Sequence, residues 1–201
     1  LLMSANHLSA QNSPLDYVNP MVGTKSMGHT FPGACAPFGL VQLSPDTEMI
    51  PHNIEGVYQP DAYKYCAGYQ YDDKTIVGFS HTHFNGTGHS DLGDILIMPM
   101  TGEVKLDMGT EENPETGYRS RFSHDNEQSE AGYYSVLLQD YGILAEMTAT
   151  ERVGVHRYTF PRDTKTGHII LDLDYGIYNY DGKVLMANLR VEDEYTLTGY
   201  R

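Results

Sequence analysis

Short apolar runs and positions that alternate between apolar and polar residues recur along the chain, while the period of a helix is nearly absent. Turn residues such as Ser-Pro-Asp at 44–46, Asp-Asp at 72–73 and Asp-Gly at 181–182 separate these runs. The pattern therefore predicts an antiparallel sandwich and not alternating βαβ units. The expected strands are Leu40–Leu43, Thr75–His81, Asp94–Met100, Gly132–Leu138, Ile143–Ala149, Val153–Phe160, His168–Leu173 and Tyr195–Arg201.

The run Val153–Phe160 predicts how the sheets are arranged. Alternation places His156, Tyr158 and Phe160 on one face, and Val153, Val155 and Thr159 on the other. Both faces are therefore expected to be covered, as in a large two-sheet stack. The chain ends at Arg201, directly on a strand-like run, so we expect the sandwich to be incomplete at its C-terminal end. The segment Gln59–Tyr71 has no clear period and is predicted to be a loop.

Composition limits the classes of partner. The 201 residues contain 27 acidic and 13 basic side chains, a formal charge of −14, and 16 Tyr. An acidic chain lacks the basic surface that nucleic acids and anionic membranes require, so neither is expected as a partner. The sequence also contains no apolar run of about 18 residues, the length that a membrane-spanning helix needs.

Residues 1–10 are interpreted as a signal-peptide remnant, because an apolar stretch is followed by small residues of the kind found at cleavage sites. Residues 11–201 would then form one β-sandwich domain of a periplasmic or secreted protein. Cys35 and Cys66 could form one bridge in an oxidising compartment. Free buried thiols are favoured, because their spacing matches no metal or redox motif.

The segment His81–Asp94 concentrates polar groups between two strand-like runs. It combines three imidazoles and two carboxylates with several glycines, which allow a ligand to approach the backbone closely. Loops of this kind on a β scaffold are more often binding or catalytic surfaces than simple connections. We therefore predict a site for a polar small molecule. Its candidate residues are His81, His83, Asn85, Gly86, Thr87, Gly88, His89, Asp91 and Asp94.

The segment permits several chemistries. His81 and His83 are two residues apart and should share a face, so with His89 and an aspartate they could bind zinc. We favour hydrogen-bonded histidines that shape the loop, because the spacing matches no zinc module. Asp91 and Asp94 could bind calcium or accept hydrogen bonds from sugar hydroxyls, and Asp94 could equally cap the following strand.

A second candidate wall precedes this segment in the sequence, at Gly28, His29 and Thr30 within Gly28–Ala34. The spacing of Gly23 and Gly28 is like that of a Walker motif. However, His29 stands where a phosphate-binding lysine belongs, so no P-loop is present. The chain contains no nucleophile elbow, and its many carboxylates do not single out a catalytic pair.

Several longer motifs in series resemble one family. They are Val18–Thr24, Gly28–Gly33, Ala36–Asp46, Gly78–His83, Asn85–Gly88, Ser90–Asp94, Phe122–Asp125, Gly132–Val136, Thr148–Gly154 and His156–Pro161. Together, from about Asp16 to Arg201, the chain resembles the N-terminal domain of glycoside hydrolase family 92. Members of this family are calcium-dependent exo-acting α-mannosidases, common in gut Bacteroidetes.

The resemblance implies an all-β super-sandwich of the galactose-mutarotase-like kind, followed by an (α/α)₆ barrel, with the active site between the two domains. The barrel is expected to supply the general acid, the general base and most ligands of a Ca²⁺ ion. In an inverting mechanism the two carboxyl groups stand about 6.5–9.5 Å apart. The expected partners are mannose-containing glycans and the protein's own C-terminal catalytic domain, and residues 1–201 alone should be inactive.

Two residue types refine this expectation. The chain contains no Trp, so any stacking on a sugar must use Tyr or Phe. The resemblance also suggests that His89 faces the leaving-group sugar and tunes linkage preference. The alternative to an α-mannosidase is a freestanding carbohydrate-binding sandwich without catalysis.

Overall fold

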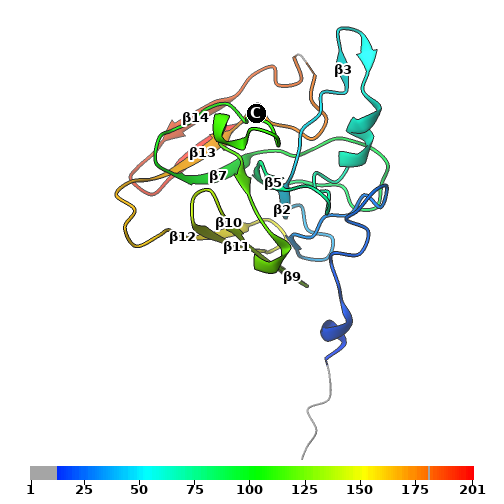
Figure 1. Cartoon of the computed structure of the whole chain (residues 1–201), viewed down its shortest axis with the longest axis horizontal. Coiled ribbons are helices and arrows are strands. Elements are labelled where there is room, and N and C mark those ends of the chain that lie inside the picture. Colours follow the sequence, from blue (N-terminus) through cyan, green and yellow to red (C-terminus); the bar gives the residue numbers. More distant parts are fainter. Residues whose placement is uncertain (1–12, 181) are drawn as a thin grey trace, which may run out of the picture.

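Two antiparallel sheets stack face to face in the computed structural model, which describes residues 13–180 and 182–201 (Figure 1). One sheet has the order β1-β2-β6-β7-β13, and the other has the order β12-β11-β10-β9. This arrangement confirms the predicted all-β antiparallel sandwich. The strands of the first sheet are β1 (Ala34–Cys35), β2 (Gln42–Asp46), β6 (Gly78–Ser80), β7 (Leu96–Thr101) and β13 (Gly167–Asp172). Those of the second are β9 (Glu127–Glu130), β10 (Tyr133–Leu138), β11 (Ile143–Ala149) and β12 (Gly154–Thr159).

The remaining elements are short. Three two-stranded ladders join β3 (Asn53–Ile54) to β4 (Val57–Tyr58), β5 (Thr75–Ile76) to β8 (Ser120–Arg121), and β14 (Asn188–Val191) to β15 (Leu197–Tyr200). The β3–β4 hairpin protrudes from the body of the domain (Figure 1). The helices in the described part are short 3₁₀ helices: η1 (Pro14–Tyr17), η2 (Pro60–Tyr65), η3 (Pro114–Thr116) and η4 (His124–Asn126). None of the described helices is long and apolar enough to cross a membrane.

The core lies between the two sheets and follows from the alternation of each strand. In β10, Tyr134, Val136 and Leu138 are fully buried, and their partners across the ladder are Met147, Ala145 and Ile143 of β11. The first sheet contributes buried side chains of its own to the same cluster, among them Leu43, Phe79, Leu96 and Met98. Burial of this apolar surface is the main force that stabilises the stack.

Most predicted strands are confirmed, but three details differ. The predicted turn 44–46 lies inside β2. Because β1 pairs only with Gln42 and Leu43, β2 is an edge strand from Ser44 onward, and an edge strand tolerates Pro45. The predicted strand 75–81 is split into β5 and β6, which pair with different strands. The segment Gln59–Tyr71, predicted to be a loop, contains the short helix η2.

The prediction that both faces of β12 are covered is wrong for the described chain. His156 and Tyr158 face inward, whereas Val153 and Val155 are 54% and 48% exposed. The sheet is packed on one side only, so the second apolar face that the alternation suggests is open to solvent. Cys35 and Cys66 are free thiols, as favoured from their spacing, and Cys66 is buried. The proposed signal-peptide remnant, residues 1–10, lies outside the described residues.

Candidate functional site

We call His81–Asp94 the histidine segment. His83 lies at its base and is held by β2. Its Nε2 is 2.8 Å from Asp46 Oδ1, and its Nδ1 is 2.7 Å from the carbonyl oxygen of Gln42. The side chains of His83 and Asp46 are both fully buried. Both ring nitrogens therefore face oxygen atoms, and Nε2 also lies 3.1 Å from Ser80 Oγ. The second oxygen of Asp46, Oδ2, is buried without a hydrogen-bond partner among the described residues.

His81 has a different environment, between the two sheets. Its Nε2 is 3.0 Å from the Nε2 of His156, and its Nδ1 is 2.8 Å from the carbonyl oxygen of Ile95. The hydroxyl of Tyr158 is 2.7 Å from Nδ1 of His156. Burial lowers the pKa of His81, and burial together with the neighbouring His81 lowers the pKa of His156 to about 3. Both rings are therefore neutral near pH 7.

The proton positions in this cluster follow from the contacts. Tyr158 donates to Nδ1 of His156, whose Nε2–H then donates to Nε2 of His81, and the Nδ1–H of His81 donates to Ile95. The partners of His81 and His83 are thus different, and the two rings do not form a metal site. Within residues 13–180 and 182–201, no group of three or more His, Cys, Asp or Glu side chains is placed to hold a metal ion. The hydrogen bonds of both rings agree with the favoured interpretation, in which the histidines shape the loop.

The tip of the histidine segment contacts the second predicted wall. The backbone N–H of Gly86 donates to the carbonyl oxygen of His29 at 2.5 Å. His29 is buried with a left-handed φ of 52°, and its ring meets that of Tyr63 edge-to-face at 4.8 Å. A Cβ added at Gly88 would lie 2.1 Å from the hydroxyl oxygen of Tyr63, so a larger residue there would have to displace the Tyr63 side chain. The structure thus brings the two predicted loops together, with Tyr63 of η2 beside them.

Side chains of this tip are open to solvent: Asn85, Thr87 and His89 are all exposed, as is the backbone of Gly86 and Gly88. The ring of His89 lies 6.1 Å from that of Phe84. The tip is therefore the most exposed part of the segment, while the base at His83 is buried and the Asp91 and Asp94 side chains are partly exposed. Whether these residues bind substrate stays a prediction.

The far end of the segment is fixed by ion pairs. Asp91 Oδ1 lies 3.2 Å from the Nζ of Lys183, and Asp94 Oδ1 lies 3.2 Å from a guanidinium nitrogen of Arg201. Burial raises the pKa of Asp91, but the backbone N–H of Leu92 and the Lys183 ammonium outweigh it, so the pKa is lowered. Both carboxylates therefore face cations in this structure, and calcium binding by Asp91 and Asp94 stays a hypothesis.

Asp94 also organises the turn before β7. It accepts a hydrogen bond from Thr82 Oγ1 at 2.6 Å, and its own N–H donates to the same Oγ1 at 2.9 Å. This reciprocal pair is a local cap, which was one of the roles expected for Asp94.

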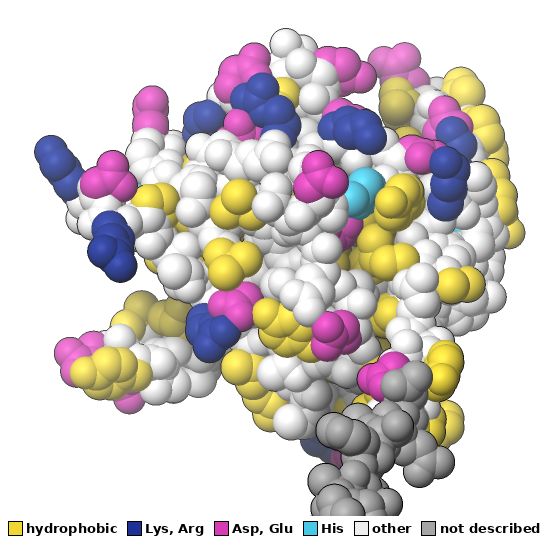
Figure 2. Space-filling model, turned by 60° about the horizontal axis from the view of Figure 1, so that its bottom comes forward, with side chains coloured by type: hydrophobic (Ala, Val, Ile, Leu, Met, Phe, Trp, Pro, Cys, Tyr) yellow, Lys and Arg dark blue, Asp and Glu magenta, His cyan; other side chains and the backbone are white. Residues whose placement is uncertain are grey.

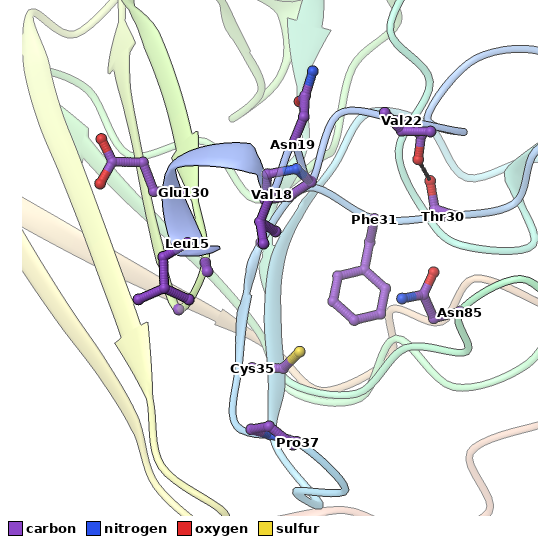
Figure 3. A pocket seen from close by; sticks show the side chains of 14 residues that line it. Leu15, Val18, Asn19, Val22, Thr30, Phe31, Cys35, Pro37, Asn85 and Glu130 are labelled. Atoms are coloured by element: carbon purple, nitrogen blue, oxygen red, sulfur yellow. Dashed lines mark hydrogen bonds between the residues drawn. The ribbon is translucent and has the colours of Figure 1, made fainter. Parts of the chain in front are cut away.

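Two cavities flank the joined loops. One, of about 530 Å³, lies between residues 15–22 and residues 30–37. Figure 3 shows Phe31 and Asn85 side by side on its wall. Thr30 also lines it and donates from Oγ1 to the carbonyl oxygen of Val22 at 2.8 Å. The second cavity, of about 510 Å³, is lined by Thr82, His83 and Phe84 of the histidine segment. The candidate residues therefore border two hollows and do not form one closed pocket.

The surrounding surface is mixed in charge. Figure 2 shows acidic and basic side chains interspersed with hydrophobic ones over the face that it presents. Two large hydrophobic side chains beside the second cavity are exposed, Phe38 and Leu40. No concentrated basic patch is visible on this face, in agreement with the acidic composition.

Several residues that shape the site were not predicted from the sequence. Gln42 and Asp46 hold His83, Tyr63 packs against both loops, and His156 pairs with His81. Asp46 had been interpreted as a turn residue. Only its position in β2, opposite the strand that leads into the histidine segment, explains its role.

The fold and the joined loops define a class of protein, a β-sandwich domain that presents a polar, loop-built surface at one edge. The model of the glycosyl hydrolase family 92 N-terminal domain matches residues 17–201. The chain therefore belongs to glycosyl hydrolase family 92, and residues 17–201 correspond to its N-terminal domain.

Solved structures of this family are similar over most of the chain. An α-mannosidase of family GH92 from Bacteroides thetaiotaomicron, solved in complex with mannoimidazole, is 42% identical with a TM-score of 0.80; the match covers 92% of this chain and 22% of that one. An inverting GH92 mannosidase from the same species is 27% identical with a TM-score of 0.62, over 81% of this chain and 20% of the other.

A fungal relative extends the comparison. An uncharacterized secreted glycosidase of Arthroderma benhamiae is 27% identical over 167 residues, which are 81% of this chain and 19% of the fungal protein. The chain thus spans about a fifth of the length of the relatives that it matches.

Proposed function

We propose that this chain is the N-terminal part of a secreted or periplasmic inverting α-mannosidase that removes terminal α-linked mannose from glycans. The observation that carries the proposal is the match to an α-mannosidase at 42% identity over 92% of the chain. Membership of a glycosidase family supports the reaction class, while the substrate and the stereochemistry belong to the proposal.

The two joined loops would form one wall of an active site completed by a C-terminal domain. The contact between Gly86 and His29 holds the loops in one surface, and the buried pair of His83 and Asp46 supports that surface from below. The exposed side chains of Asn85, Thr87 and His89 are hydrogen-bonding groups of the kind that recognise sugar hydroxyls. Their role would be to orient the sugar; proton transfer would belong to the other domain.

Binding of calcium would also depend on the other domain. The described residues do not group into a metal site, and Asp91 and Asp94 are paired with cations. Bound Ca²⁺ would grip and polarise sugar hydroxyls when present. We therefore expect a chelator to abolish turnover by the complete enzyme, while the melting temperature of the 201-residue chain stays the same.

The test compares the complete enzyme with residues 1–201 alone. The complete enzyme should release mannose from α-mannobiose, and ¹H NMR during hydrolysis should detect β-mannose first, as inversion requires. The isolated chain should show no hydrolysis. Release of α-mannose as the first product would contradict inversion, and hydrolysis of other glycosides but not mannosides would contradict the substrate.

The tip of the histidine segment provides a sharper test. His89→Ala in the complete enzyme should change the relative kcat/KM for α-1,2-, α-1,3- and α-1,6-mannobiose and leave the melting temperature unchanged, because the side chain is exposed. Asp163→Ala, an exposed residue between β12 and β13 that lines neither of the two cavities, is the control. Equal kcat/KM ratios in wild type and His89→Ala would contradict contact between His89 and the leaving-group sugar.

A further inference from the structure

A cluster of aromatic rings connects the protruding β3–β4 hairpin to the segment that follows β13. The ring of His52 lies 4.7 Å from Tyr58 and 4.4 Å from Tyr178, and Tyr178 lies 5.4 Å from Tyr180. The backbone supports this cluster, since the N–H of His52 donates to the carbonyl oxygen of Asn179 at 3.3 Å. The hairpin is therefore held against the chain at 178–180.

The hairpin turn itself has a defined geometry. Glu55 and Gly56 both have positive φ, 51° and 84°, as a two-residue type I′ turn requires. The N–H of Gly56 donates to Asn53 Oδ1 at 2.7 Å. These contacts fix the direction in which the hairpin projects.

A cavity of about 470 Å³ lies between the hairpin and the segment after β13, and we call it the hairpin cavity. Its lining combines two carboxylates, two amides and one tyrosine that is 49% exposed: Glu55, Asp174, Asn53, Asn179 and Tyr180. The other lining residues are Pro51, Gly56 and Gly182. Among the described residues no lysine or arginine lines it, so its two carboxylates would disfavour an anionic ligand.

The hairpin cavity is connected to the candidate site through one side chain. Lys183 donates from Nζ to the carbonyl oxygen of Tyr178 at 2.5 Å and pairs with Asp91 of the histidine segment at 3.2 Å. The Lys183 side chain is only 12% exposed. Lys183 thus joins the aromatic cluster to the histidine segment, so a glycan of several residues bound at that segment could extend to the hairpin cavity.

We propose that the hairpin cavity binds a neutral hexose unit of the glycan, beyond the mannose that is cleaved. This inference rests on the proposed function for the identity of the glycan. A tyrosine ring offers an apolar face to the C–H groups of a sugar ring, and carboxylate and amide groups accept and donate hydrogen bonds to its hydroxyls. The cavity would favour larger glycans without taking part in bond cleavage.

Kinetics of the complete enzyme test the proposal. Tyr180→Ala should raise KM for α-mannotetraose about ten-fold and leave kcat/KM for 4-nitrophenyl α-mannoside unchanged, because the aryl substrate is too short to reach the cavity. Tyr180→Phe keeps the ring and should retain most of the affinity. Asp174→Asn is a second variant, which keeps the size of the side chain and should also weaken only the longer substrate.

A matched control is available in the same chain. Tyr195 is 89% exposed in the turn between β14 and β15, outside the lining of the cavity, so Tyr195→Ala should leave both substrates unchanged. Equal effects of Tyr180→Ala on both substrates, or no effect on either, would overturn the proposal while leaving the α-mannosidase assignment intact.

Binding to the 201-residue chain separates this proposal from the proposed function. Titration with α-mannotetraose should shift amide resonances of residues 53–56 and 174–180 in wild type and not in Tyr180→Ala. Absence of these shifts, or shifts confined to residues 81–94, would overturn the hairpin cavity as a sugar site. This measurement needs no catalysis, so it decides the inference even when the complete enzyme hydrolyses no mannoside.

Discussion

His81 and His83 are two residues apart, yet they lie in two regions with opposite chemistry. His83 contacts a buried carboxylate and a carbonyl oxygen, so both of its ring nitrogens face oxygen atoms. His81 contacts a second imidazole, which suits a ring with a single proton. The comparison shows that the hydrogen-bond partners of each histidine are set by the strand that packs against it, which is β2 for His83 and β12 for His81.

The two regions also differ in what they stabilise. The pair of His83 and Asp46 joins the histidine segment to a strand of its own sheet, whereas the pair of His81 and His156 joins that segment to the opposite sheet. The first is therefore an anchor of the loop, and the second is a contact between layers. Substitutions that affect one pair and not the other can test this distinction.

The largest effect is expected at the anchor. His83→Ala removes the only ring that meets Asp46 among the described side chains and leaves a fully buried carboxylate without its partner. Breaking a buried pair in this way costs about 3–5 kcal/mol. Urea unfolding of the 201-residue chain should show this loss in the free energy of unfolding. A loss below about 1 kcal/mol would mean that the pair contributes little.

A pair of glycine substitutions tests how firmly Asp46 is held in place. Gly68 and Gly56 both have positive φ, 77° and 84°, so alanine is strained at either position by about 1–2 kcal/mol. A Cβ at Gly68 would also lie 1.8 Å from Asp46 Oδ1, while a Cβ at Gly56 would meet no atom within 4 Å. Gly68→Ala should therefore cost about 1–3 kcal/mol more than Gly56→Ala. Equal losses in thermal unfolding would show that Asp46 can move away freely.

Acid should weaken the contact between the layers. The pKa of His156 is lowered to about 3 from its ordinary 6.5, mainly by burial. Between these values the unfolded chain takes up a proton that the folded chain does not, so stability falls as the pH drops from about 6.5 towards 3. One such proton changes the free energy of unfolding by at most about 1.4 kcal/mol per pH unit.

The comparison with His156→Gln isolates this contribution from the many carboxylates that titrate in the same range. The variant should lose less stability per pH unit between pH 6 and pH 4 than wild type. Parallel curves of unfolding free energy against pH for the two proteins would contradict a neutral, buried His156.

The smallest effect is expected at the exposed tip. His89 lies outside both pairs, and His89→Ala should change the free energy of unfolding by less than about 0.5 kcal/mol. The same urea experiment that measures His83→Ala provides the value. A loss comparable to that of His83→Ala would show that the tip also anchors the loop. It would contradict the distinction between a buried, anchoring base and an exposed tip.

The sequence by itself determined the fold class and most strands. Alternation marks β10 and β11 clearly, because each of these strands has fully buried apolar residues at a period of two. The short ladders at 53–58 and 188–191 were not predicted, since such strands are mostly exposed and lack that alternation. The motifs in series also predicted the family, which the match to residues 17–201 confirms.

Only the tertiary structure decided which side chains of the site are free and which are already paired. Spacing predicted that His81, His83, Asp91 and Asp94 belong to one polar segment. Their partners lie far away in the sequence, on β2, on β12 and at Lys183 and Arg201. Alternation along a strand indicates which face a residue occupies, but it does not indicate what packs on that face. Those partners are set by the pairing of strands and the stacking of sheets, which depend on the whole chain at once.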